Sequence, residues 1–236
     1  MTIQTRIGRR LVGVARHDGM TYFLEILQPL LEGTGVTLHV FLLTLALSVP
    51  FGLGLALLRL SPWRLVGRVV NGYIWLMRGT PLMLQMLFIY FALPFVPVIG
   101  VRLPDFPAAI VAFVLNYAAY FAEIFRAGIQ SIERGQYEAA KVLGLSYGQT
   151  MRRVVLPQVI KRILPPMSNE TITLVKDTSL IYVLAMNDLL RAARGLVQRD
   201  FTTMPFVVAA AFYLLMTLVL TWGFQYLEKR HAVYDD

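Results

Sequence analysis

The sequence predicts an all-α integral membrane protein with about five transmembrane helices. Of its 236 residues, 57% are hydrophobic and only 15% are charged, and the mean hydropathy is +0.61. In soluble domains about a quarter of the residues are charged. The apolar residues also fall into long runs, and a helix needs about 20 such residues to cross the hydrocarbon core of a bilayer. Together these observations exclude an ordinary soluble domain.

Five stretches are long and apolar enough, or nearly so, to be membrane spans: 36–58, 82–98, 108–125, 172–190 and 207–227. In the first stretch, Ser48, Gly52 and Ala56 place small residues at a four-residue spacing. This spacing favours close packing against another helix. The fourth stretch is the weakest because it contains Lys176 and Asp177.

The second stretch directly follows the tetrapeptide Arg78-Gly79-Thr80-Pro81. Glycine weakens a helix and proline removes a backbone donor. We therefore expect this tetrapeptide to separate the span from an incoming amphipathic helix at 65–77. The chain shows no internal repeat strong enough to indicate two inverted halves.

The distribution of lysine and arginine predicts the orientation, because cytoplasmic loops are enriched in both. Thirteen basic residues lie between spans one and two, between spans three and four, and in the tail, against eight on the other side. This places the N-terminus outside and the C-terminus in the cytoplasm. The arginines up to Arg16 argue against it, unless an amphipathic segment or a sixth membrane segment around 22–31 precedes the first span.

The domain assignment follows these spans. Residues 1–32 form an N-terminal amphipathic or extramembrane segment, 33–229 form the transmembrane domain, and 230–236 form a cytoplasmic tail.

Several functional classes are excluded. The net charge of +8 lies in the gaps between apolar runs, which is typical of loops that face anionic lipid and not of nucleic-acid binding. With no cysteine and three scattered histidines, we expect no metal site. No constellation of catalytic side chains is present, so we expect no enzyme. The sequence lacks Gly-x-x-x-x-Gly-Lys-Ser/Thr, so we expect this chain to bind no nucleotide cofactor.

The loop between spans three and four, at 126–168, has a sequence that predicts two short helices. Good helix formers run from Glu138 to Leu143, and Gly144 is placed to end the first helix. Ser146 and Gln149 have the spacing of a capping box for the second helix. We expect Pro157 to end that second helix.

This basic helix pair has two readings that composition supports equally. One is an amphipathic hairpin that lies on lipid headgroups. The other is a docking element for a cytoplasmic partner, in which the small side chains of Ala139 and Ala140 let another surface approach the backbone.

Four separated motifs resemble a known family, the type I ABC importer permease subunits of the inner membrane. They are Glu138-Ala139-Ala140 with Gly144 and Leu156-Pro157, which looks like the EAA signature; Arg78-Gly79-Thr80-Pro81-Leu82; the segment 122–129; and Lys176-Asp177-Thr178-Ser179-Leu180. The last three resemble the polar amino acid branch, which takes up histidine, glutamine or arginine.

The resemblance implies a function and a set of partners. It implies a permease in the bacterial cytoplasmic membrane that moves amino acids across the lipid bilayer by alternating access. Loop 126–168 would be the coupling loop, whose helix seats in a groove of a cytoplasmic ABC ATPase dimer. ATP and Mg would be bound by that ATPase. The other partners would be a second permease copy or a homologous permease, and an extracytoplasmic solute-binding protein.

Polar residues inside the spans are candidates for the substrate path: Asp177, Glu123, Asn116, Gln85 and Thr178. A charge at the bilayer centre costs at least about 2.5–3.5 kcal/mol, so ionised groups there usually have a role. Asn116, Tyr120 and Glu123 recur at one helical face. Thr173, Asp177, Leu184 and Asp188 would share a face if the fourth span were one helix.

Alternative roles remain for these residues. Neutral Asn116 and Gln85 suit hydrogen bonds between helices. Glu123 can pair with Arg126 one turn away, and Arg78 is expected to anchor its helix at the headgroups. An ion-gradient-driven secondary transporter, with Asp177 and Glu123 as ion carriers, is the alternative function.

Overall fold

A computed structural model describes residues 19–97 and 100–231, and this described part is helical with no strand. The helices and helical turns are α2 (Gly19–Arg59), α3 (Arg64–Gly79), α4 (Leu82–Leu87), the π turn η1 (Phe88–Ala92), the 3-10 turn η2 (Leu93–Phe95), α5 (Asp105–Gln130), α6 (Arg134–Val142), α7 (Tyr147–Thr150), the π turn η3 (Met151–Val155), α8 (Leu156–Asp177), the 3-10 turn η4 (Thr178–Leu184), α9 (Leu189–Asp200) and α10 (Met204–His231). The predicted all-α class is confirmed.

Helix α2 begins well before the span predicted at 36–58. It runs without a break from Gly19, so residues 19–32 are the first part of this helix and not a separate element. Ile26 and Leu30 are buried against α9, which explains why the helix continues upstream. Gly33 is a packing residue, because a Cβ there would lie 2.8 Å from the carbonyl oxygen of Asp188. The N-terminal arginines up to Arg16, which argue against the predicted orientation, lie outside the described part of the chain.

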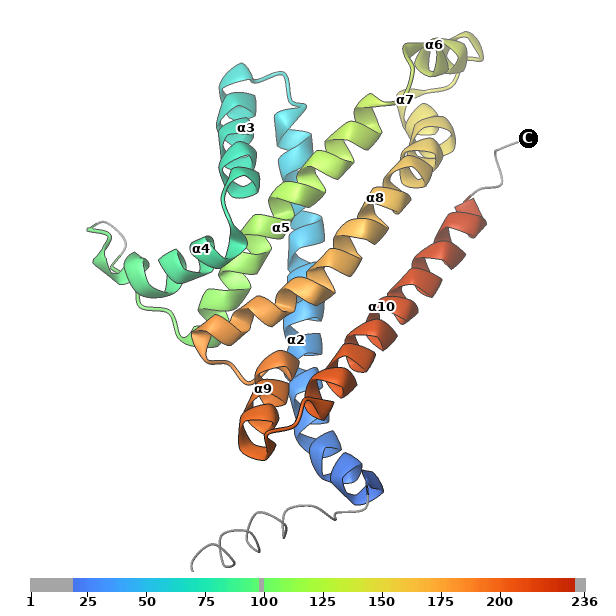
Figure 1. Cartoon of the computed structure of the whole chain (residues 1–236). Coiled ribbons are helices and arrows are strands. Elements are labelled where there is room, and N and C mark those ends of the chain that lie inside the picture. The colour runs from blue at the N-terminus through green and yellow to red at the C-terminus, as the bar shows by residue number, and fades with distance from the viewer. Residues whose placement is uncertain (1–18, 98–99, 232–236) are drawn as a thin grey trace, which may run out of the picture.

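Helices α2 and α5 form the centre of the molecule (Figure 1). Ser48, Gly52 and Ala56 are all buried on α2, which confirms the predicted close contact. A Cβ on Gly52 would lie 2.7 Å from the Cβ of Phe121 on α5, a separation that packed side chains do not reach. The small residues therefore set how closely the two helices approach.

The predicted break before the second span is confirmed, but the helical run that follows it is shorter than the predicted stretch 82–98. Helices α3 and α4 meet at Pro81 with a bend of 105°. The helical run that starts at Leu82 passes through a π turn and a 3-10 turn and ends at Phe95, short of 98. Pro94 has no N–H to continue the helix, which accounts for the early end.

The fourth predicted span, 172–190, is wrong. Helix α8 starts at Leu156 and ends at Asp177. Beyond it the hydroxyls of Thr178 and Ser179 donate to backbone carbonyls of the last turn, which tightens the chain into η4. Residues 185–188 are not helical, so the face expected to join Asp177 to Asp188 does not exist.

Pro157 does not end a helix, contrary to the prediction. The backbone is helical from Tyr147 to Asp177, and Pro157 lies where the π turn η3 gives way to α8. The amide of Leu156 bonds to the carbonyl oxygen of Met151, five residues earlier. This wider turn accommodates a residue that cannot donate a hydrogen bond.

Three helices in the described part are long and apolar enough to cross a membrane: α2, α5 and α10. The bent pair of α3 and α4 makes a fourth if it is counted as one span. The stretches 108–125 and 207–227 lie inside α5 and α10, as predicted. Helix α8 runs beside α5 and α10 (Figure 1) but is not among the apolar spans.

The two ends of the molecule differ. Helices α6 and α7 form a small lobe at one end, which we call the α6 lobe (residues 131–155). Helix α9 and the start of α2 lie at the opposite end, and α10 finishes on the side of the α6 lobe (Figure 1).

Candidate functional site

A cavity of about 410 Å³ opens where the break between α3 and α4 faces α5 and α8. It is lined by Thr80, Pro81, Leu82, Met83, Asn116, Tyr117, Tyr120, Glu170, Thr173, Asp177 and Leu180. The bend at Pro81 takes the backbone of α4 away from the direction of α3. The break therefore leaves room for a cavity beside the polar faces of α5 and α8.

Asp177, one of the residues predicted to line the substrate path, lies on this cavity. Its carboxylate is half-buried and accepts a 2.7 Å hydrogen bond from the hydroxyl of Tyr117. It also stands in the last turn of α8, where the helix dipole disfavours a negative charge. Asp177 therefore does not add to the stability of α8 through the helix dipole.

Glu170 is a second carboxylate on the same cavity, and the sequence reasoning missed it. It precedes Asp177 by two helical turns and so shares a face of α8 with it. The spacing was a usable signal. The predicted fourth span begins at 172 and therefore leaves Glu170 just outside it.

A second cavity of about 470 Å³ adjoins the first, and the two share Tyr120 and Glu170. Arg78 lines it and lies over the ring of Tyr120, with its guanidinium carbon 5.2 Å from the ring centroid. The sequence suggested that Arg78 anchors α3 at the headgroups. In the structure Arg78 instead makes a cation–π contact at the cavity. Together the two cavities are lined by two arginines, Arg78 and Arg162, and by three carboxylates, Glu123 on α5 and Glu170 and Asp177 on α8.

Asn116 and Gln85 are engaged in hydrogen bonds between helices. The amide of Asn116 donates to the backbone carbonyl of Met77 at 3.0 Å and to the side-chain oxygen of Gln85 at 3.0 Å. The Gln85 amide in turn donates to the carbonyl oxygens of Met77 and Thr80 and to the Thr80 hydroxyl. These bonds satisfy carbonyls at the broken end of α3. Asn116 also lines the cavity, whereas Gln85 does not.

Glu123 lines the second cavity, whereas Thr178 lines neither cavity. Glu123 is held by Arg126 on its own helix and by Arg59 at the end of α2, and it lines the second cavity. The expected ion pair of Glu123 with Arg126 is thus present, and Arg59 forms a second ion pair with the same carboxylate. Thr178 is fully buried beside the cavity, and its hydroxyl donates to the carbonyl oxygen of Val175 at 2.7 Å.

The α6 lobe is built as the sequence of its turns predicts. Gly144 has a left-handed φ of 72°. Its amide and that of Leu145 bond to the carbonyl oxygens of Lys141 and Ala140, which forms a Schellman motif that ends α6. Ser146 and Gln149 form the predicted capping box. Helix α6 itself begins at Arg134, earlier than expected.

The lobe presents exposed apolar side chains around its motif residues. Glu138 and Ala139 are exposed, whereas Ala140 is only 2% exposed and packs inward. Val142 is 86% exposed and Leu143 is 77% exposed. Large apolar side chains left in water at a helix end are typical of a docking surface.

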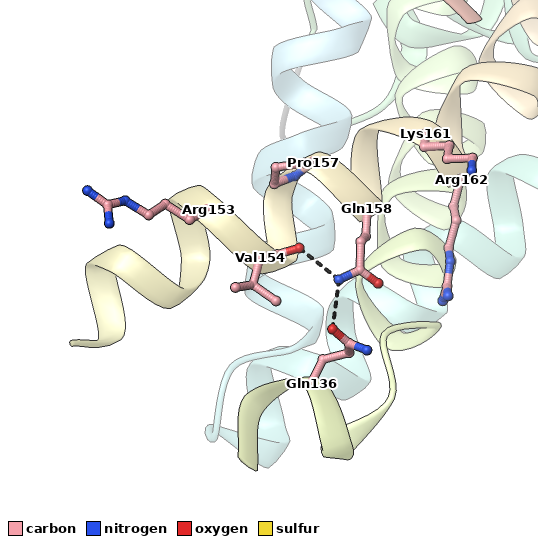
Figure 2. Close-up of a pocket in the computed structure, with 7 residues that line it drawn as sticks. All are labelled: Gln136, Arg153, Val154, Pro157, Gln158, Lys161 and Arg162. Carbon is pink, nitrogen blue, oxygen red and sulfur yellow. Dashed lines mark hydrogen bonds between the residues drawn. The ribbon is translucent and has the colours of Figure 1, made fainter. Parts of the chain in front are cut away.

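The lobe is tied to the start of α8. Gln158 donates to the side-chain oxygen of Gln136 on α6 at 3.1 Å and to the backbone carbonyl of Val154 at 2.9 Å (Figure 2). Pro157 is half-buried next to Gln158, and Leu156 is exposed. The predicted pair Leu156-Pro157 is therefore part of the junction between the lobe and the membrane helices.

Apolar helices, a cavity with carboxylates at a helix break and an exposed lobe at one end are features of polytopic membrane transport subunits. The chain belongs to the family of binding-protein-dependent transport system inner membrane components, whose model matches residues 48–233.

Characterised relatives cover most of the chain. The arginine transport system permease protein ArtQ of Bacillus subtilis is 36% identical over 85% of this chain and 91% of its own length. The glutamine transport system permease protein GlnP of Escherichia coli is 39% identical over 86% of this chain and 93% of its own length. The family expected from the four sequence motifs is confirmed.

Solved structures share the fold. An amino acid ABC transporter crystallised with histidines has a chain that is 35% identical, with a TM-score of 0.78 over 90% of this chain and 97% of that chain. The MetNI methionine ABC transporter matches with a TM-score of 0.62 at 16% identity, over 92% of this chain and 99% of that chain. At this identity the second match supports the fold alone.

Proposed function

We propose that this chain is the permease subunit of an ATP-driven importer that carries a polar amino acid into the cell. The observation that carries the proposal is the joined pair of cavities at the break between α3 and α4. They present Arg78 from one helix and Glu170 and Asp177 from another. A zwitterionic amino acid needs groups of both signs, one for its carboxylate and one for its ammonium. The amino acid transport permeases among the relatives support this substrate class.

In this proposal Asp177 and Glu170 bind the ammonium group and Arg78 binds the carboxylate. Tyr117 fixes the orientation of Asp177 through its 2.7 Å hydrogen bond. Asn116 holds the broken end of α3 in place and presents its side chain to the same cavity. Glu123 has a positioning role, because its two arginine partners already neutralise it.

The α6 lobe is proposed as the docking element for a cytoplasmic ABC ATPase dimer, which binds ATP and Mg. Its exposed Val142 and Leu143 supply apolar contact area and Glu138 supplies a charge. A second permease, identical or homologous, and an extracytoplasmic solute-binding protein complete the complex. The family description, which names binding-protein-dependent transport, supports the last of these partners.

The proposed orientation places the α6 lobe and the end of α10 in the cytoplasm and the start of α2 outside. Most of the described basic residues lie toward the lobe end, as the positive-inside rule requires.

Uptake in proteoliposomes tests the function. The chain is reconstituted with its ATPase and binding protein and given radiolabelled basic, acidic and amide amino acids. We expect the proteoliposomes to take up at least one of these amino acids. This uptake should require ATP on the side of the membrane that carries the ATPase. Uptake driven by an ion gradient without ATP would instead establish the secondary transporter.

A further inference from the structure

The first cavity, at the break between α3 and α4, has an excess of negative charge. Two carboxylates line it, those of Glu170 and Asp177, and none of the described residues that line it is cationic. Arg78 lines the second cavity, which also includes Glu170. If Arg78 binds the carboxylate of an amino acid, the ammonium group of that amino acid balances only one of the two carboxylates. The other remains without a counter-charge, which is costly in a partly buried site.

The remaining charged groups of the second cavity do not offset this excess. Glu123 is neutralised by its two arginine partners. Arg162 donates to the backbone carbonyl of Ser131 at the end of α5. It also precedes Glu170 by eight residues, which is about 12 Å along α8. Glu170 and Asp177 therefore keep one negative charge that a zwitterionic substrate does not balance.

The spacing of the two carboxylates indicates that they bind two different cationic groups. Glu170 and Asp177 are seven residues apart on α8, which corresponds to about 10 Å along the helix axis. Helical side chains lean in the same direction, toward the N-terminus, so the carboxylates keep about this separation. A charge-assisted hydrogen bond of about 2.8 Å at each carboxylate leaves about 5 Å between them. One ammonium group therefore reaches one carboxylate, and the other is left for a second cation.

The neutral polar side chains of the first cavity also suit a cation, because most of their donors are already in use. Both amide hydrogens of Asn116 are bonded to groups of α3 and α4, which leaves its oxygen for a ligand. The hydroxyls of Thr80, Tyr117 and Thr173 donate within the protein, so they can only accept from a ligand. Ammonium and guanidinium groups carry donors and no acceptor, and this lining complements them. An amide or acidic side chain would need donors, which among these described hydroxyls and amides only Tyr120 can supply.

We propose that the substrate is an amino acid with a cationic side chain, such as arginine or lysine. This inference rests on the proposed amino acid transport function and names the substrate class of the same site. Arg78 binds the α-carboxylate, one of Glu170 and Asp177 binds the α-ammonium group, and the other binds the cationic end of the side chain. The three charges of the substrate then meet three charges of opposite sign. The methylene groups of such a side chain cover the distance between the two carboxylates.

The test measures binding to the purified complex of permease and ATPase without the solute-binding protein, so that only the membrane site selects. Radiolabelled L-arginine, L-citrulline, L-glutamine and L-glutamate are compared by equilibrium dialysis. Citrulline has nearly the shape of arginine but carries a neutral ureido group in place of the guanidinium. We expect arginine to bind at least about tenfold more tightly than each of the other three, because hydrogen bonds between charged groups are the stronger ones.

The variants Glu170→Gln and Asp177→Asn test the division of tasks between the two carboxylates. One of them should lower the affinity for arginine at least about tenfold and leave that for citrulline unchanged, because it removes only the partner of the side chain. Its retained citrulline binding also shows that it is folded. The other should lower the affinity for both ligands. Glu133→Gln is the control, because Glu133 is exposed and lines neither cavity, and it should bind like the wild type.

The possible failures of this inference differ from those of the proposed function. Citrulline or glutamine bound as tightly as arginine would overturn the inference, and so would equal losses for arginine and citrulline in both variants. It would also be overturned if a complex that transports an amino acid bound none of the four, since selection would then lie outside this site. Absence of ATP-dependent uptake of every amino acid would instead overturn the proposed function.

Discussion

Asp177 is a residue on which the proposed binding of the substrate ammonium group directly depends. Among the described residues, Tyr117 donates to Oδ2 of Asp177, and the Asp177 side chain also lines the cavity. Its neighbour Thr178 is fully buried and turned away from that cavity. Two adjacent residues of one sequence motif therefore have different tasks.

Asp177→Asn is expected to raise the half-saturating substrate concentration at least about tenfold. The amide keeps an oxygen for the Tyr117 hydroxyl but loses the charge, and hydrogen bonds to charged groups contribute about 1.5–3 kcal/mol. Concentration-dependent uptake in proteoliposomes measures the change.

Thr178→Val is the matched control, because it removes a polar group next to the cavity but not on it. It should leave the half-saturating concentration unchanged while lowering thermal stability. Unchanged uptake in Asp177→Asn would show that the carboxylate is structural.

At the scale of elements, the α6 lobe depends on its turn at Gly144. The left-handed φ of 72° allows the two backbone bonds that end α6 and direct the chain into α7. This turn sets the angle at which the exposed face of α6 is presented to a partner. Its effect is conformational, because a Cβ at this position would contact nothing within 4 Å.

Gly144→Ala is expected to destabilise the end of α6 by about 1–2 kcal/mol, the cost of a left-handed conformation with a side chain. Amide hydrogen exchange of residues 134–142 should become faster. Gly148→Ala provides the comparison, since Gly148 is helical and has equally open space. It should slow exchange in α7 or leave it unchanged. Equal behaviour of the two variants would contradict the role of the turn.

Glu138→Lys is expected to abolish co-purification of the ATPase and ATP-dependent uptake while the chain still inserts into the membrane. Glu138 is exposed on the second turn of α6, so the reversal changes surface charge without disturbing a buried contact. A pull-down with tagged permease measures the association. Glu32→Lys, an exposed reversal on α2 at the opposite end, should leave it intact. Normal co-purification of the Glu138 variant would remove α6 from the interface.

At the scale of the whole molecule, the packing of α2 against α5 determines whether the helices assemble. Gly52→Ala is expected to cost about 1–3 kcal/mol, because the new methyl group would collide with the Cβ of Phe121 and the helices must move apart. A thermal melt of the detergent-solubilised protein measures the loss. Gly54→Ala is the control on the same helix, with nothing within 4 Å of its added Cβ, and should be neutral or stabilising. A neutral Gly52 variant would mean that the helices repack freely.

The sequence predicted the parts of the fold that local chemistry decides. The break at Pro81, the stop at Gly144, the capping box at Ser146 and the small residues of α2 all follow from backbone conformation or side-chain size. The apolar helices α5 and α10 follow from hydropathy alone.

Features that depend on neighbouring helices were not predictable in the same way. The π turn at Met151–Val155 lets the helix continue past Pro157, a departure from the usual rule. The early start of α2 depends on burial against α9, about 160 residues away in sequence. Glu170 joins the cavity only because α8 starts at Leu156 and carries this residue beside Asp177.

The unbroken course of α2 has a mechanical consequence. Near its middle, the hydroxyl of Thr37 accepts a 3.2 Å hydrogen bond from the amide of Leu189 on α9, and at its C-terminal end Arg59 is bound to Glu123 on α5. The helix has 41 residues and is about 60 Å long. If the helix rotates about its middle by about 5°, its two ends move about 2–3 Å in opposite directions. A small displacement on one side of the membrane is thus matched, with its sign reversed, at the opposite side.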